Sequence, residues 1–222
     1  MCFSATASFT AAAVLAGVGA ATLVQKPKPK DLAFAAIPAI FAVHQAIEGA
    51  VWLSLNGGNA PPNALVVAYL LIAQVLWPAY IPLSVIAMEP KRRRRPALWI
   101  LLAAGLFVSG ALAIILAQHH YTVTAVSDGL RYATDLEFER RLLELYLLAV
   151  VAPLLLSRHR YVVAFGAVTL VGAIVTVMAF YFAAASVWCF FSGLASVLVY
   201  LHVRRSRRNN GVCEASTKIE AA

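Results

Sequence analysis

Long apolar runs alternate with short polar segments along most of the chain. A helix needs about 20 apolar residues to cross the hydrocarbon core of a bilayer. The sequence therefore predicts an all-α bundle of seven transmembrane helices, at residues 5–24, 32–55, 63–87, 97–117, 139–156, 161–181 and 184–203. We expect residues 1–205 to form this transmembrane domain, and the polar residues 206–222 to form a disordered cytoplasmic tail.

Positive charge falls in every second gap between the apolar runs, and the other gaps are neutral or acidic. The four basic blocks are Lys26–Lys30, Lys91–Arg95, Arg158–Arg160 and Arg204–Arg208. Short loops rich in Lys and Arg stay in the cytoplasm. The pattern thus predicts an N-terminus outside and a C-terminus inside, in the inner (plasma) membrane of the cell.

Composition supports the same class of protein. Hydrophobic residues make up 62% of the 222 residues and charged residues 13%, whereas soluble domains average nearer half and a quarter. The net charge of +8 would suggest a nucleic-acid partner in a soluble protein. Here the charge abuts apolar runs, so we expect binding to anionic lipid headgroups and no nucleic acid. The first apolar run has no positive charge before it, unlike a cleaved signal peptide, so we expect it to remain in the mature protein.

One segment differs from the other connections. HYTVTAV and LRYATDL flank the turn signal Ser127-Asp128-Gly129. A turn between two alternating, β-branched stretches is typical of a hairpin. We predict a small extracytoplasmic loop or β-hairpin between the fourth and fifth helices.

Four segments carry a resemblance to a known family: MCFSATASF at the start, HQAIEGAVWLSL, WPAYIPLSVIAMEPKRRRR and SVWCFFSGLASVLVY. Together they resemble an uncharacterised bacterial membrane family whose members begin with MCFSA. The likeness extends over most of the chain and is weakest in the 118–138 loop and the tail. It implies a multi-pass membrane protein and supplies no mechanism.

His44 and Glu48 are the leading candidates for chemistry. Ionisable side chains at membrane depth cost about 2.5–3.5 kcal/mol or more, so their presence needs a reason. The two residues are four apart in the second run, and Trp52 follows one turn later, so all three share one helical face. One interpretation is a metal or proton site, with Glu48 as a catalytic candidate. The alternative is an ion pair or hydrogen bond that packs two helices.

Four more residues are candidates for the same site. A metal site would use His44, Glu48 and one of His119 and His120, with a divalent ion such as zinc. Adjacent histidines point to different faces, and a solvated interfacial position is the alternative for both. Gln74 could add polar lining or could instead hydrogen-bond a neighbouring helix, and Trp188 is a further candidate binding residue.

Cys2 and Cys189 both belong to the predicted outer side. They could form a disulfide that joins the N-terminus to the seventh helix. After removal of the initiator Met, Cys2 would instead carry an amine and a thiol, as a metal ligand or a catalytic nucleophile. Simple burial is the third interpretation. Neither His159 nor His202, at the cytoplasmic boundary, is assigned a role.

Three classes of function stay open for an outward-opening polar site around His44 and Glu48. A metal-dependent hydrolase would be similar to the ceramidase-like membrane enzymes, although this chain lacks their histidines four apart in a late helix. A sensor or receptor would bind a small molecule or a lipid. A proton-coupled transporter would use the pair as a relay, but we find no inverted repeat.

Overall fold

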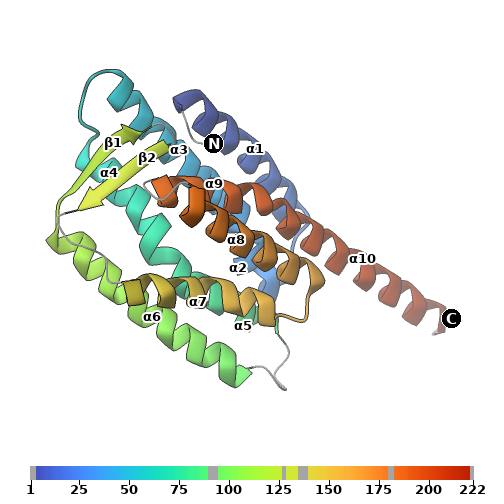
Figure 1. Cartoon of the computed structure of the whole chain (residues 1–222). Helices are drawn as coiled ribbons and strands as arrows, with labels where there is room; N and C mark the ends of the chain where they lie inside the picture. The colour runs from blue at the N-terminus through green and yellow to red at the C-terminus, as the bar shows by residue number, and fades with distance from the viewer. Residues whose placement is uncertain (1–3, 90–94, 127–128, 135–139, 180–182, 221–222) are drawn as a thin grey trace.

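The computed structural model describes residues 4–89, 95–126, 129–134, 140–179 and 183–220, and of residues 95, 140, 184–185 and 209–220 the backbone alone. The chain is mostly helical (Figure 1). Its elements are α1 (Ala5–Val24), the short η1 (Pro29–Asp31), α2 (Leu32–Ala35), α3 (Ile37–Asn56), α4 (Asn63–Leu70), the π-helical η2 (Leu71–Leu76), α5 (Trp77–Met88), α6 (Arg95–Gln118), β1 (Tyr121–Val126), β2 (Gly129–Thr134), α7 (Arg140–Leu156), α8 (Arg160–Ala179), α9 (Ala184–Ala195) and α10 (Val197–Glu220).

Six helical segments within the described residues are long and apolar enough to cross a membrane. They are Ala5–Val24, Pro29–Asn56, Asn63–Met88, Pro96–Gln118, Arg160–Ala179 and Ser186–Arg208. The remaining predicted span corresponds to α7, which is 17 residues long and therefore about 25 Å. Its first turn holds Arg140 and Arg141, so its apolar part is shorter still. The multi-pass membrane class is confirmed, and the seventh span stays a prediction.

Three of the predicted spans are interrupted helices. The second breaks at Ala36, between α2 and α3, just before Pro38, and the last breaks at Ser196, between α9 and α10. At the first break the hydroxyl of Tyr80 donates a hydrogen bond of 2.6 Å to the carbonyl of Ala33. A side chain of another helix thus satisfies a backbone group near the interruption, as the membrane interior requires.

The third span contains the π-helical segment η2 immediately before Pro78. Proline has no N–H, so it cannot bond the carbonyl four residues earlier, and helices deform around it. Within η2 the carbonyl of Ala73 accepts a hydrogen bond of 2.6 Å from the hydroxyl of Tyr146 on α7. The distortion is therefore tied to a contact between helices.

Gly105 is the place where α6 approaches α5 most closely. A Cβ at this position would lie 1.9 Å from the carbonyl oxygen of Pro78. That carbonyl has no helical partner, because Pro82, four residues on, lacks an N–H. The missing side chain of Gly105 thus permits the crossing of the two helices.

The predicted hairpin is confirmed. Strands β1 and β2 pair antiparallel, with Tyr121 opposite Thr134 and Val126 opposite Gly129. Gly129 has φ +148°, a conformation that favours glycine. The residues of the turn itself, Ser127 and Asp128, lie outside the described residues.

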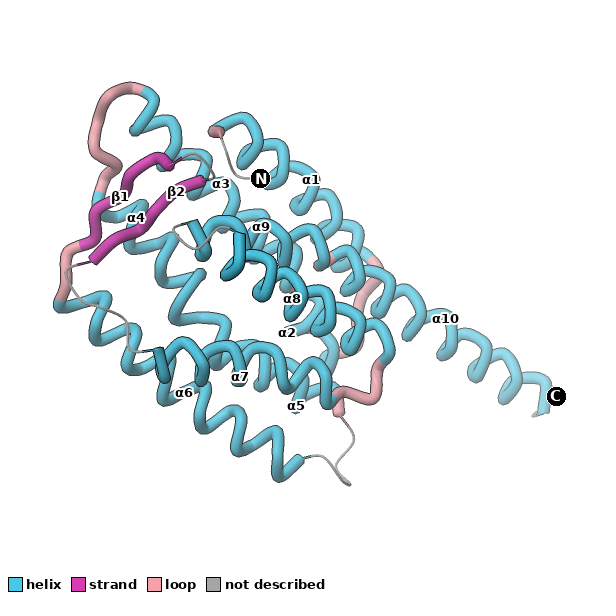
Figure 2. The backbone as a smooth tube through the Cα atoms, in the orientation of Figure 1, coloured by secondary structure: helices cyan, strands magenta, loops and turns pink. Residues whose placement is uncertain are grey.

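The connections gather at two ends of the bundle (Figures 1 and 2). We call one the hairpin end, because β1, β2 and the loop from Gly57 to Pro62 lie there. The other is the basic end, where the side chains of Lys26, Lys28, Lys30, Arg158 and Arg160 are exposed. Helix α10 runs past this end to Glu220, and the disorder that we predict for residues 206–222 stays a prediction.

Candidate functional site

The predicted face of the second span is buried inside the bundle. His44 and Glu48 are fully buried, and Trp52 is 6% exposed. All three lie on α3, and its first helical turn holds Pro38, whose fixed φ suits that position. The orientation toward the interior, as opposed to lipid, agrees with the high cost of an ionisable group in hydrocarbon.

Glu48 accepts hydrogen bonds from two fully buried side chains. Gln45, one turn earlier on α3, donates from Nε2 to Oε2 of Glu48 at 3.1 Å. Ser186 on α9 donates from its hydroxyl to Oε1. The second bond joins residues 138 positions apart in the chain and brings the last helix pair against α3. Glu48 therefore belongs to a polar cluster formed by two helices.

His44 has a different environment. Its ring stacks on that of Tyr69 with centroids 4.3 Å apart, and Tyr69 stacks on Tyr132 of β2, again at 4.3 Å. The backbone of Tyr69 approaches the imidazole, but neither ring nitrogen makes a hydrogen bond of good geometry to any described residue. An imidazole offers two polar positions, so His44 is a buried polar group with unused hydrogen-bonding capacity.

The hairpin covers this cluster. Leu130 of β2 is 1% exposed and packs with Ala5, Val51 and Trp52. A Cβ at Gly129 would lie 3.2 Å from the hydroxyl oxygen of Ser186. One strand thus contacts the donor to Glu48 directly and reaches His44 through the aromatic stack.

The structure does not gather the predicted metal ligands. Among the described residues, no three side chains of His, Cys, Asp or Glu converge as a metal site would require. His120 is exposed and His119 is half-buried, beyond the end of α6. The pair His44 and Glu48 alone offers fewer protein ligands than the three typical of a catalytic zinc site. Bound zinc stays a prediction from the sequence.

Gln74 and Trp188, which are also predicted binding residues, lie on helices other than α3. Gln74 is half-buried in η2, and its Oε1 finds no partner in the described part of the chain. Trp188 donates a hydrogen bond of 3.0 Å from Nε1 to the carbonyl of Thr169 on α8, which fixes its ring between helices. Neither residue hydrogen-bonds to Glu48.

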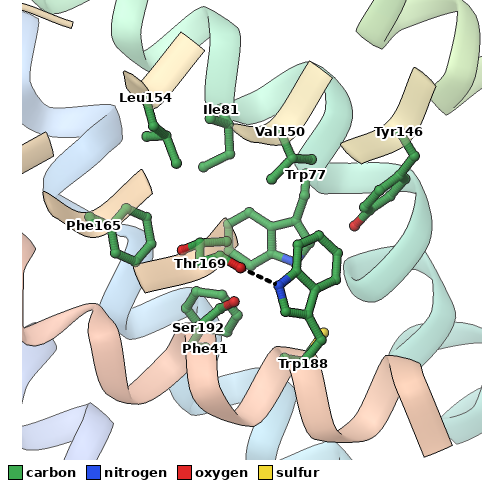
Figure 3. A pocket seen from close by; sticks show the side chains of 11 residues that line it. Phe41, Trp77, Ile81, Tyr146, Val150, Leu154, Phe165, Thr169, Trp188 and Ser192 are labelled. Carbon is green, nitrogen blue, oxygen red and sulfur yellow. Dashed lines mark hydrogen bonds between the residues drawn. The ribbon is translucent and has the colours of Figure 1, made fainter. Parts of the chain in front are cut away.

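Trp188 lines a small cavity between α3, α5, α7, α8 and α9 (Figure 3). About 20 Å³ of it is open to the centre of a water-sized sphere. The lining is mostly aromatic and aliphatic, and it includes one cysteine and three residues with a hydroxyl group. The lining residues are Phe41, Trp77, Ile81, Tyr146, Val150, Leu154, Phe165, Thr169, Trp188, Cys189 and Ser192. This cavity is a second internal feature that the sequence does not predict.

Cys189 is 4% exposed and lies within electrostatic range of Glu48. Its predicted disulfide partner, Cys2, falls outside the described residues. The structure therefore tests neither the disulfide nor a catalytic role for Cys2. The Cys2–Cys189 pair therefore stays a prediction. The burial of Cys189 beside the glutamate is an observation of its own.

A second buried glutamate lies at the basic end. Glu89, just after α5, is 4% exposed. Its Oε1 accepts hydrogen bonds of 2.7 Å from the hydroxyl of Ser157 and from the backbone N–H of Arg158. The carboxylate thus fastens the connection between α7 and α8 to the end of α5.

Sequence reasoning missed four residues of the cluster: Gln45, Tyr69, Tyr132 and Ser186. The signal for Gln45 was available, because it adjoins His44 and lies three residues before Glu48 on one helix. Tyr132 belongs to the predicted hairpin, but no pattern indicates the aromatic ring on which it stacks. A lone serine such as Ser186 carries no signal in an apolar run.

Comparisons with known proteins add a family and no function. No curated protein and no solved structure matches the chain. One family model, described as a family of unknown function (DUF6629), matches residues 1–214. That range includes the hairpin, Glu48, Glu89 and all the helices apart from the end of α10, and the chain belongs to this family.

Proposed function

We propose that this protein spans the membrane seven times and binds a small hydrogen-bonding ligand at His44 and Glu48, beneath the hairpin. The observation that carries the proposal is the fully buried imidazole of His44, whose two nitrogens make no hydrogen bond of good geometry to any described residue. Leaving buried polar groups unsatisfied costs about 1–3 kcal/mol each. A ligand that accepts from one nitrogen and donates to the other recovers this cost.

The seven-span topology is supported by the course of the chain. Helix α6 ends at the hairpin end and α8 begins at the basic end, so α7 runs from one end to the other (Figure 1). It packs against α5, α6 and α8. With the basic end in the cytoplasm, the N-terminus and the hairpin face outward. Reporter fusions after residue 59 and after residue 126 should then report the outside, and fusions after Arg205 the cytoplasm. A cytoplasmic signal after residue 126 would contradict this orientation.

The hairpin gives the site its entrance. Tyr132 and Gly129 of β2 are the hairpin residues that touch the neighbours of His44 and Glu48. An isolated two-stranded hairpin is marginally stable, so its closed position depends on these contacts. A ligand that binds His44 therefore changes the balance between a closed and an open hairpin. This coupling suits a receptor or sensor.

Transport is a second candidate, and the interrupted helices favour it. Transporter sites are typically formed where helices are discontinuous near the middle of the membrane. Breaks occur here at Ala36 and Ser196, and η2 distorts the third span. The segments that contain them also hold Glu48, Ser186 and Tyr69. A carrier would take the same ligand from the outside and release it inside.

Thermal unfolding of the purified protein in detergent tests the site. The probes are zinc chloride, short carboxylic acids, amides and amines, each added separately. We expect one of the organic classes to raise the melting temperature of the wild type but not of Glu48→Gln or His44→Ala. Glu144→Gln is the matched control, since Glu144 is exposed on α7. A shift with zinc alone would favour the metal-dependent hydrolase, and the same organic shift in every variant would contradict the site.

A further inference from the structure

The last two helices carry a buried polar face that extends from the ligand site at Ser186 toward the basic end. Ser186, Cys189, Ser192 and Ser196 recur at intervals of three or four residues, and His202 follows on α10. All five are between 0% and 6% exposed. Polar side chains at membrane depth face functional pathways inside the bundle more often than they face lipid. The face begins at Glu48, which accepts the hydroxyl of Ser186.

The cavity continues this face toward the basic end. Cys189 and Ser192 line it from α9, and Thr169 lines it from α8 (Figure 3). The hydroxyl of Thr169 and the indole N–H of Trp77 are buried and have no hydrogen-bonding partner within the described residues. A water molecule needs a volume of about 10–15 Å³ and two or more polar partners. The cavity, at about 20 Å³, has room for one water, and its lining, although mostly apolar, includes the polar residues Thr169, Cys189 and Ser192.

Two histidines end the path at the basic end. The rings of His159 and His202 meet edge to face with centroids 4.9 Å apart. The Nε2 atoms of both are buried and find no partner in the part of the chain that the structure describes. Asp31 and Lys30 lie within electrostatic range of His202. Between the cavity and this pair lie Ser196, whose buried hydroxyl also has no partner among the described residues, and Phe34, whose ring contacts both His202 and Phe165 of the cavity.

We propose that this face is a proton pathway from Glu48, through the cavity, to His202 and His159. Sixteen positions separate Ser186 from His202, which is about 24 Å of helix and most of the hydrocarbon thickness of about 30 Å. Cys189 lies within electrostatic range of Glu48, and His159, Asp31 and Lys30 lie within electrostatic range of His202. His44 precedes Glu48 by four residues on α3.

Each transfer along the path conserves protons. A proton from the water at the hairpin end binds the carboxylate of Glu48. Each hydroxyl, and the water in the cavity, accepts one proton and releases one to the next group. His202 then gives one proton to the water at the basic end, and the chain returns to its initial state. The pathway goes beyond ligand binding, because it uses Glu48 but does not need the ligand; protons reach the buried carboxylate through the entrance that the hairpin covers.

Proton flux through reconstituted protein tests the pathway. The full chain is placed in phospholipid vesicles that enclose a pH-sensitive dye, and a potassium gradient with valinomycin supplies the driving voltage. We expect the wild type to acidify or alkalinise the vesicles faster than protein-free vesicles. His202→Phe, which keeps an aromatic ring against Phe34, should reduce the flux to the protein-free background. Ser196→Ala should reduce it partly.

Two control variants separate the pathway from general damage. Ser109→Ala removes a buried, unpartnered hydroxyl from α6, and His119→Phe removes a histidine outside the face; both should conduct like the wild type. Unfolding curves show which variants are folded, and Thr169→Val replaces any path variant that is not. A wild-type flux equal to the background, or an unchanged flux in folded His202→Phe and Thr169→Val, would overturn the pathway. Ligand-induced melting shifts at His44 do not depend on either result.

Discussion

Glu48 and Glu89 are both buried carboxylates, but they lie at opposite ends of the bundle in different surroundings. Glu89 holds a connection in place, because one oxygen accepts both a hydroxyl and a backbone N–H from the α7–α8 corner. Glu48 accepts hydrogen bonds from two side chains and lies on α3 one turn after His44, whose nitrogens make no hydrogen bond of good geometry to any described residue. Both sites therefore contain a buried acid. The site of Glu48 differs because the nearby imidazole of His44 has unused hydrogen-bonding capacity. We expect Glu89 to serve stability and Glu48 to serve binding.

The largest effect should come from Glu89→Ala. It leaves the hydroxyl of Ser157 and the N–H of Arg158 without their acceptor, which should cost about 3 kcal/mol in unfolding free energy. Chemical unfolding in detergent measures the loss. Glu144→Ala, at an exposed position of the same protein, should change stability by no more than about 0.5 kcal/mol. If Glu89→Ala and Glu144→Ala were equally stable, the hydrogen bonds of Glu89 would not stabilise the fold.

Glu48 should separate stability from binding. Glu48→Leu leaves the donors Gln45 and Ser186 unsatisfied and should cost about 2 kcal/mol. Glu48→Gln keeps the shape and one acceptor oxygen, so its cost should stay below about 1 kcal/mol. The same variant should nevertheless lose the ligand-induced melting shift. If the Glu48→Gln protein still showed the melting shift, Glu48 would be a structural residue, as Glu89 is.

The sequence predicts the elements of this fold better than the contacts between them. Apolar length and period indicate the helices, and Ser127-Asp128-Gly129 between β-branched stretches indicates the hairpin. The break at Ala36 and the π-helical segment had a visible signal in Pro38 and Pro78, because proline removes a donor. The break at Ser196 had none. Periodicity describes one helix at a time, so it contains no information on the surroundings of that helix.

The candidate site shows the same division. His44 and Glu48 were predictable, since two ionisable residues on one apolar face are costly. Their partner Ser186 was not, because it is 138 positions from Glu48 and serine is ordinary in transmembrane helices. The metal interpretation extended the pair to His119 and His120 by their residue type alone. The structure places His120 on the surface, which residue type does not indicate.

The hairpin offers a smaller test of the comparison. Tyr132→Ala removes one ring of the stack with Tyr69 and should cost about 1 kcal/mol, whereas Tyr132→Phe should be nearly neutral. Hydrogen exchange in residues 121–134 should become faster in the alanine variant, because the closed position of the hairpin loses a contact. Exchange at the α7–α8 corner held by Glu89 should stay unchanged. Equal acceleration at both ends would indicate a general loss of stability.

The smallest expected effect is the coupling between Ser186 and Glu48, and it is also the most specific. Ser186→Ala removes one donor to the carboxylate, and Glu48→Gln weakens the acceptor of the same hydrogen bond. If the bond across α3 and α9 exists, the double variant should lose less stability than the sum of the two single variants. The difference should be about 0.5–1 kcal/mol, the usual range for residues in contact. Combining Ser186→Ala with Glu89→Gln gives the control, since those residues lie at opposite ends of the bundle and their effects should add. Additive effects for Ser186 and Glu48 would mean that the serine does not hold the carboxylate. Glu48 would then depend on α3 alone, and the hairpin would lose its connection to the glutamate through Gly129.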